Sequence, residues 1–184
     1  MRYGYRRTTM EDIARNLGMS RPALYLSFPS KQAILRDVVA MTYDEVLREI
    51  EAGLPTQPSL TDQLMHVFEL WSIRPFDLVS RAPAAAELIS GSFDFASDVF
   101  ESGAKRLARI LAGAIRGAVA DPEALQPSAD EVARVMVAAA QGFKSVARDT
   151  NDMRTLVRDL VRMTVAGLPV TSKASRASAR RKHR

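Results

Sequence analysis

Apolar residues recur at spacings of three and four along almost the whole chain, and this periodicity is typical of amphipathic α-helices. Few runs show the alternation of apolar and polar residues that a half-buried strand requires. The 184 residues include no cysteine, which excludes disulfides, thiolate metal sites and cysteine nucleophiles. The sequence therefore predicts an all-α fold, and we expect neither a metal site nor a cofactor.

The first forty residues contain the start and stop signals of three helices. Thr8, with Glu11 three residues later, predicts a capping box for a first short helix. Gly18 supplies the residue that turns the chain at the end of this helix. Ser20 and Ser30 are expected to cap the second and third helices, because serine side chains accept hydrogen bonds from the first free amides of a helix.

Beyond these helices the chain divides into a body and a tail. The segment 53–59 is rich in Gly and Pro and is the clearest linker signal. We therefore expect an N-terminal domain at 1–52, a C-terminal helical domain at 53–168 and a disordered basic tail at 169–184. Periodicity and turn residues predict helices at 30–51, 60–72, 75–80, 83–90, 95–120, 128–148 and 152–167.

The charge is distributed unevenly along the sequence. Residues 1–40 contain seven Lys and Arg against three Asp and Glu, and residues 171–184 contain six against none. The segment 41–170 is acidic, with thirteen basic against eighteen acidic residues. A basic N-terminal segment on an acidic body indicates contact with a polyanion, the alternative being ordinary solvated surface charge. The basic tail either adds phosphate contacts or serves solubility.

The first two short helices, joined by a tight turn that contains glycine, form the helix-turn-helix pattern. In that motif the N-terminal end of the second helix enters the DNA major groove. Arg21 is placed to donate two hydrogen bonds to a guanine, and Ala23 to contact a thymine methyl group. The side chains placed to reach phosphates are Thr9, Ser20, Tyr25 and Lys31. The small core of the helix pair is expected to consist of Ile13, Leu17, Leu24 and Phe28.

Residues 3–39 resemble the DNA-binding domain of TetR-type repressors. The family pattern is present in order and spacing, as Gly4-Tyr5, a threonine, Ile13-Ala14, Leu17-Gly18, Ser20, Leu24-Tyr25, Phe28 and Lys31. The resemblance implies an all-α protein with an N-terminal helix-turn-helix domain and a C-terminal helical bundle for ligand binding and dimerisation.

The resemblance also implies a function. Members of the family are homodimeric transcription regulators, usually repressors, that bind a palindromic operator in double-stranded DNA. A small apolar effector enters the C-terminal bundle, pushes the helix that begins at Ser30 and spreads the two DNA-reading heads apart. The DNA-facing residues carried over by position are Thr9, Ser20, Arg21, Pro22, Ala23, Tyr25 and Lys31.

The sequence departs from the family pattern at its start. The family domain normally begins with one more helix before the segment Tyr3-Gly4-Tyr5, where this sequence begins. We interpret the departure as a misassigned start codon or a truncated copy, and expect it to expose the small core of the helix pair. The alternative function is a dimeric ligand-binding or interaction protein without sequence-specific DNA binding.

The body contains candidates for an effector pocket and for a dimer interface. Aromatic and methionine side chains suit an apolar ligand site, although an ordinary core has the same composition. The pocket candidates are Met65, His66, Phe68, Trp71, Phe93 and Phe100. The apolar stripes of the last two helices suit either an intramolecular core or a dimer interface, and the family favours the dimer. The dimer-interface candidates are Val132, Val135, Met136, Ala139, Phe143, Leu156 and Leu160. Gly113 and Gly117 favour close packing of their helix within the bundle.

The sequence lacks the motifs of an enzyme. It has no Gly-rich phosphate loop, and its two histidines, His66 and His183, cannot form a metal cluster within one chain. The longest stretch without charge, residues 163–172, is about half as long as a membrane-spanning helix. No secretory signal is visible. We therefore expect a cytoplasmic protein without catalytic activity, associated with the nucleoid when it is bound to DNA.

Overall fold

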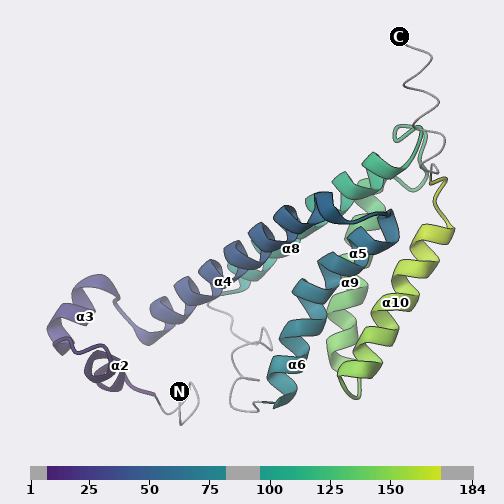
Figure 1. Ribbon diagram of the computed structural model, residues 1–184. Coiled ribbons are helices and arrows are strands. Elements are labelled where there is room, and N and C mark those ends of the chain that lie inside the picture. Colours follow the sequence, from purple (N-terminus) through teal and green to yellow (C-terminus); the bar gives the residue numbers. More distant parts are fainter. Residues whose placement is uncertain (1–7, 82–95, 171–184) are drawn as a thin grey trace.

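The computed structural model describes residues 8–81 and 96–170, which form helices joined by loops and one isolated antiparallel bridge between Val119 and Val170. The helices are α2 (Met10–Asn16), α3 (Arg21–Ser27), α4 (Lys31–Gly53), α5 (Leu60–Phe68), α6 (Arg74–Arg81), α8 (Ser97–Ala118), α9 (Ala129–Val146) and α10 (Thr150–Ala166), with a 3-10 turn η1 (Leu54–Thr56) and a π-helical turn η2 (Glu69–Ile73). A small head of α2 and α3 lies at one end of the long helix α4, and the body packs around the other end (Figure 1). The predicted all-α fold is confirmed.

The turn between α2 and α3 and the caps of α3 and α4 are as predicted. Gly18 has a φ of 65° and turns the chain between α2 and α3. Ser20 Oγ accepts a hydrogen bond from the Ala23 amide at 3.3 Å. Ser30 caps α4 in the same way, accepting from the Ala33 amide at 3.1 Å. These caps satisfy amides that have no partner inside their own helix.

The predicted cap of α2 is wrong by one residue. Thr9, not Thr8, accepts the hydrogen bond at the start of the helix, and its partner is Asp12 rather than Glu11. The Asp12 carboxylate accepts from the Thr9 amide at 2.9 Å and from the Thr9 hydroxyl at 2.6 Å. Both threonines have an acidic residue three positions later, so the capping-box spacing fits either of them.

The core of the head differs in part from the expectation. Met10, Ala14 and Leu24 form its buried centre, with Ile13, Met19, Phe28 and Ile34 partly buried around them. The expected exposure of Leu24 is wrong, because this side chain is only 1% exposed beneath α2. Leu17 is 64% exposed and is not part of the core, because it lies at the last turn of α2, where the helix ends.

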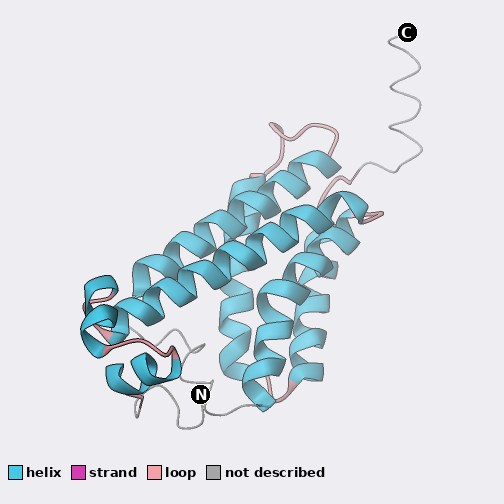
Figure 2. Cartoon of the chain, turned by 60° about the vertical axis from the view of Figure 1, so that its left-hand side comes forward, coloured by secondary structure: helices cyan, strands magenta, loops and turns pink. Residues whose placement is uncertain are grey.

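α4 connects the head to the body and runs parallel to α8. Figures 1 and 2 show the two helices side by side. Arg36 pairs with Asp98, and Arg106 pairs with Asp44, so that both ion pairs join residues 62 positions apart. Nearer the end of α4, Arg74 of α6 donates two hydrogen bonds to the Glu49 carboxylate, at 3.0 and 2.6 Å. This pair lowers the pKa of Glu49 and raises that of Arg74.

The second helical segment continues where the sequence predicts a break. Helices were expected at 60–72 and 75–80, whereas α5, η2 and α6 form one uninterrupted helical run from residue 60 to residue 81. The π-helical turn η2 lies directly before Pro75. Because proline lacks the N–H that a regular α-helix would use, a widened turn lets the helix pass it instead of ending.

The main core lies between the C-terminal half of α4 and the elements α5, η2, α8, α9 and α10. Each of these elements contributes fully buried side chains, among them Phe68, Leu111, Met136 and Val157. The last helix begins at residue 150 rather than 152, because Asp149 caps it by accepting from the Asp152 amide at 2.8 Å. The helix predicted at 83–90 and most of the predicted tail lie outside the described residues.

Two glycines with opposite surroundings give a matched stability test. A Cβ at Gly53 would lie 2.2 Å from His66 Nε2, whereas a Cβ at Gly113 would meet nothing within 4 Å. We expect Gly53→Ala to cost about 1–3 kcal/mol of unfolding free energy through overpacking. Gly113→Ala, in the interior of α8, is expected to gain about 0.5–1 kcal/mol.

Denaturant unfolding of both variants measures these effects. The Gly53→Ala cost should disappear when His66 is also changed to Ala, and an unchanged cost in that background would contradict the contact.

The open space at Gly113 and at Gly117 also shows that the expected close packing of this pair against the bundle is wrong within the protomer.

Candidate functional site

The first turn of α3 presents a group of exposed side chains at the tip of the head. The Ser20 cap and Pro22 in the first turn fix the start of the helix. Ser20, Arg21 and Tyr25 are exposed, while Leu24 is buried and holds α3 against α2. The Arg21 guanidinium carbon lies 5.6 Å from the centroid of the Tyr25 ring. Such a cation–π contact restricts the arginine side chain without using its hydrogen-bond donors.

The structure places the other DNA-facing candidates in different surroundings. Ala23 is half-buried in α3, and Pro22 is exposed beside Arg21. The Thr9 hydroxyl already donates to the Asp12 carboxylate, and these hydrogen bonds lower the pKa of Asp12. Lys31 Nζ donates to the Thr8 carbonyl at 2.8 Å. The Lys31–Thr8 contact joins residues that are far apart in the sequence. The Thr9–Asp12 pair is one of two pairs with the spacing of a capping box. The sequence pattern therefore specifies neither contact.

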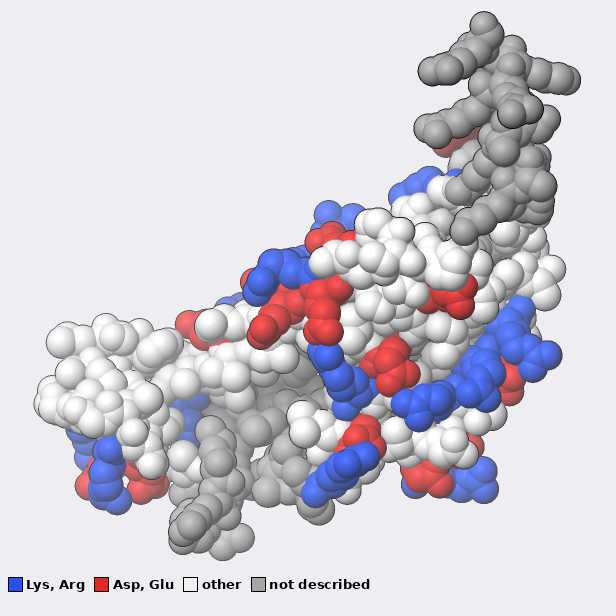
Figure 3. Space-filling view, in the orientation of Figure 1, with Lys and Arg blue, Asp and Glu red and all other residues white. Residues whose placement is uncertain are grey.

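Charged side chains of both signs alternate over the body (Figure 3). On the face shown there, Lys and Arg side chains gather over α10, where Arg154, Arg158 and Arg162 follow at four-residue spacing. Arg154 donates to Glu69 at 3.0 Å, and Arg162 lies 3.7 Å from Asp159. The acidic neighbours mean that this row is partly neutralised rather than a continuous basic surface.

An aromatic cluster connects α4 with the body. Tyr43 stacks on Trp71 with ring centroids 4.8 Å apart, and it meets Phe100 edge-on at 5.7 Å. Burial raises the pKa of Tyr43 to about 12. A Cβ at Gly103 would lie 3.2 Å from Trp71 and 3.3 Å from Tyr43. Glycine at this position therefore allows both rings to approach α8.

The structure brings only some of the pocket candidates to this cluster. Trp71 and Phe100 both contact Tyr43, whereas Phe68 is fully buried in the main core. The His66 ring lies against Gly53 at the end of α4, and its Nε2 has no hydrogen-bond partner among the described residues. Met65 is partly buried against the main core. Phe93 lies outside the described residues.

Tyr43 and Gly103 were missed by the sequence reasoning. A signal for Tyr43 exists, because Tyr43, Leu47 and Ile50 follow at spacings of four and three on the body-facing side of α4. The spacing marks Tyr43 as inward-facing, but it does not reveal that Trp71 and Phe100 meet it. Gly103 has no local signal, because the need for a small residue arises from rings on two other elements.

The dimer-interface candidates divide into an inner and an outer group. Met136 is 1% exposed and belongs to the main core. Val132, Ala139, Phe143, Leu156 and Leu160 are half-buried, and Val135 is 65% exposed. A groove of about 240 Å³ runs between α9 and α10, lined in part by Val132, Val135, Leu160 and Met163. Met163, which the sequence reasoning did not select, is 76% exposed beside this groove.

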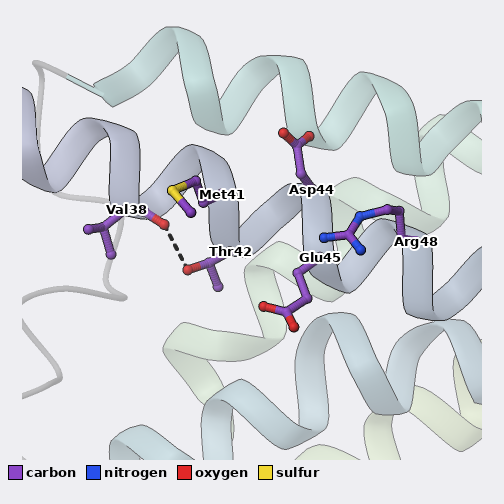
Figure 4. Close-up of a pocket in the computed structure, with 6 residues that line it drawn as sticks. All are labelled: Val38, Met41, Thr42, Asp44, Glu45 and Arg48. Atoms are coloured by element: carbon purple, nitrogen blue, oxygen red, sulfur yellow. Dashed lines mark hydrogen bonds between the residues drawn. The ribbon is translucent and has the colours of Figure 1, made fainter.

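A second hollow lies on the outer side of α4. Its volume is about 490 Å³, and its lining residues all come from that helix: Val38, Met41, Thr42, Asp44, Glu45 and Arg48 (Figure 4). The Thr42 hydroxyl donates back to the Val38 carbonyl at 2.8 Å and so is engaged within the helix. Val38 and Met41 are exposed apolar side chains in this hollow. No group of three or more potential metal ligands occurs among the described residues.

Comparison with known proteins finds a family likeness in the N-terminal segment. Residues 1–38 match the family model of bacterial regulatory proteins, tetR family. The likeness to this family therefore covers the N-terminal segment. An uncharacterized HTH-type transcriptional regulator of Mycobacterium tuberculosis (strain ATCC 25618 / H37Rv) is 31% identical over 77 residues, which cover 42% of this chain and 40% of that relative. The family and this relative are transcriptional regulators and not enzymes, in agreement with the sequence prediction.

Solved structures extend the likeness in fold to nearly the whole chain. A transcriptional regulator from Cytophaga hutchinsonii has a TM-score of 0.72 at 20% identity, covering 91% of both chains. A regulator from Saccharomonospora viridis, solved with choline, has a TM-score of 0.65 at 23% identity and covers 88% of both chains. The regulator FadR from Bacillus subtilis, solved with stearoyl-CoA, has a TM-score of 0.62 at 16% identity and covers 91% of this chain and 92% of its own. At these identities the likeness shows the fold.

Within the described residues, none of the helices is both long and apolar enough to cross a membrane.

Proposed function

We propose that this chain is a TetR-type transcriptional repressor that binds a palindromic operator as a homodimer and is released by a small apolar effector. The observation that carries the proposal is the N-terminal part of α3 with its cap, where Ser20, Arg21 and Tyr25 are exposed on a helix-turn-helix at the tip of the molecule. A helix end of this kind fits the major groove of DNA, where base edges are accessible.

Arg21 is proposed to read a base, and its neighbours to set the register. A guanidinium donates two parallel hydrogen bonds, which matches the O6 and N7 acceptors of guanine. Tyr25 holds the arginine by its ring and leaves its own hydroxyl for a phosphate. Ser20, Pro22 and Ala23 complete the proposed contact surface, with Thr9 at the start of α2 beside the DNA backbone.

The exposed apolar face of α9 and α10 is proposed as the dimer interface. A two-fold dimer places the same patch on both protomers, so the patch has to complement itself. Val135 and Met163 are exposed and line a groove together with Val132 and Leu160. Apolar side chains that are exposed in one protomer become buried when a second copy packs on this face.

The cluster of Tyr43, Trp71 and Phe100 is proposed as the effector site. Aromatic side chains bind apolar ligands well, and this cluster joins α4 to the body. A ligand that inserts between Tyr43 and its two partners would displace α4, whose other end carries the head. The ligands in the S. viridis and B. subtilis regulators support a small-molecule site in a fold of this type.

The effector proposal is tested by ligand titration. Trp71 is the only tryptophan of the chain, so a ligand in this cluster should change the intrinsic tryptophan emission. We expect the same ligand to release the protein from its operator. Phe100→Ala should weaken ligand binding by about 10-fold, because it removes a large aromatic contact, and should leave operator affinity without ligand within about twofold.

Met41→Ala on the outer side of α4 serves as the control and should bind the ligand like the parent protein. The effector site would lie elsewhere if a ligand released the operator without any change in Trp71 emission. Unchanged ligand affinity in Phe100→Ala would lead to the same conclusion.

A further inference from the structure

One hydrogen bond connects the beginning of α4 with the beginning of α2. Lys31, the first residue of α4, donates from Nζ to the carbonyl oxygen of Thr8 at 2.8 Å, across 23 positions of sequence. Thr8 directly precedes Thr9, the cap of α2. The contact is partly buried. The bond therefore joins the start of α4 to the residue that precedes the cap of α2, and both positions are held by a helix end.

Among residues 8–81, the other attachment of the head to α4 is apolar. The buried core of the head consists there of Met10, Ala14 and Leu24, against which Ile34 of α4 packs in part. The chain itself connects α3 to α4 through the short segment 28–30. Apolar packing of this size is non-directional, so it holds the head near α4 but leaves its rotation weakly defined. A directional hydrogen bond on the α2 side supplies a second fixed point.

We propose that Lys31 is a positioning residue that holds the reading head at a set angle to α4, rather than a residue that neutralises a DNA phosphate. The inference rests on the proposed operator binding. The ammonium group is already used on a main-chain carbonyl, and the side chain is half-buried. One of the three N–H donors of the ammonium group is directed inward at the Thr8 carbonyl, and this direction favours a role inside the head over a phosphate contact.

This arrangement also explains how a movement of α4 reaches α3. The Lys31 bond moves α2 with the first turn of α4, and the packing of Leu24 against Met10 and Ala14 moves α3 with α2. Without the bond, α4 could shift while the head lagged behind at the segment 28–30. The two heads of a dimer would then sample several spacings, and binding to two half-sites at a fixed distance would weaken.

The test compares Lys31→Met, which keeps most of the apolar stem, with Lys31→Arg, which keeps a charged donor. Affinity for the operator and for random DNA is measured over a series of salt concentrations. We expect Lys31→Met to lower operator affinity by about 10-fold, the effect of losing a hydrogen bond from a charged donor. The salt slope and the affinity for random DNA should stay the same, and Lys31→Arg should restore most of the loss.

The opposite pattern would overturn the inference. A phosphate contact predicts that Lys31→Met weakens operator and random DNA alike and lowers the salt slope by about 0.9 per protomer. An unchanged operator affinity in Lys31→Met would also overturn it, because a positioning residue has to affect specific binding.

Hydrogen exchange without DNA separates this inference from the proposed function. The Ile13 amide bonds to the Thr9 carbonyl at 3.1 Å in the first turn of α2. Its exchange should accelerate in Lys31→Met while amides of α8 and α9 keep their parent rates, which shows that the body stays folded. If the parent protein bound no DNA, the proposed function would fail while the exchange result still decided the Lys31 contact. Unchanged exchange at Ile13 would refute the contact directly.

Discussion

Arg21→Ala is expected to lose about 1–3 kcal/mol of operator affinity per half-site while affinity for random DNA stays nearly the same. The reason is the position of Arg21 in the exposed first turn of α3, where its guanidinium is held over the Tyr25 ring. Alanine would remove both of the hydrogen bonds proposed to reach the base but leaves the helix and its Ser20 cap intact. Because a dimer places one α3 in each half-site, the loss applies twice.

Arg15→Ala is the matched control for this prediction. Arg15 is also an exposed arginine of the head, but it pairs with Glu11 and Asp12 on α2. We expect a small effect of similar size on operator and random DNA. Electrophoretic titration of both variants on both DNAs measures the difference. An equal loss on the two DNAs for Arg21→Ala would contradict base reading by this residue.

Val135→Asp is expected to dissociate the dimer and, with it, operator binding. Val135 is 65% exposed in one protomer, at the edge of the groove between α9 and α10. If a second copy covers this face, the variant buries an unpaired carboxylate in each protomer, at a cost of about 3 kcal/mol or more each. The stability of the single protomer should hardly change, because the side chain is exposed there.

Sedimentation and DNA binding measure this effect together. The parent protein should sediment as a dimer at micromolar concentration and the variant as a folded monomer with little affinity for the full operator. Met41→Asp changes an equally exposed apolar residue on α4 and should leave the dimer intact. A dimeric Val135→Asp would show that α9 and α10 do not form the interface.

Local sequence signals predicted the head well, because its helices are set by neighbours in sequence. Ser20, Ser30 and Gly18 act within three or four residues of their own positions, and the structure places all three as expected. The cap of α2 was missed because two adjacent threonines offer the same spacing to an acidic residue. In the structure Thr9 is the cap, and the spacing alone does not distinguish it from Thr8.

The candidate effector site was predicted less completely, because its residues meet through long-range packing. Trp71 and Phe100 were selected for their side-chain chemistry, and the same criterion selected Phe68, which is in the core, and His66, which lies against Gly53. Which aromatic residues form one cluster depends on how α4, η2 and α8 are arranged. The sequence periodicity defines the inward side of each helix but not its neighbours.

The continuous helix through Pro75 illustrates a third kind of limit. Proline normally marks the beginning or end of a helix, and the prediction of a break at this point follows that rule. The π-helical turn η2 changes the hydrogen bonding just before Pro75, so the rule does not apply. The turn also buries Leu70, Trp71 and Ile73, and this burial is a tertiary feature that the local proline rule does not include.

Selection from a random double-stranded DNA library is the most direct test of operator recognition by this chain. The account predicts enrichment of a palindrome whose two half-sites are separated by about one helical turn or a multiple of it, with guanine at the position that Arg21 reads. The Arg21→Ala variant should lose selectivity at that position alone. If a folded dimer of this chain enriched no sequence, or only a single half-site, the proposed two-fold reading of an operator would be wrong.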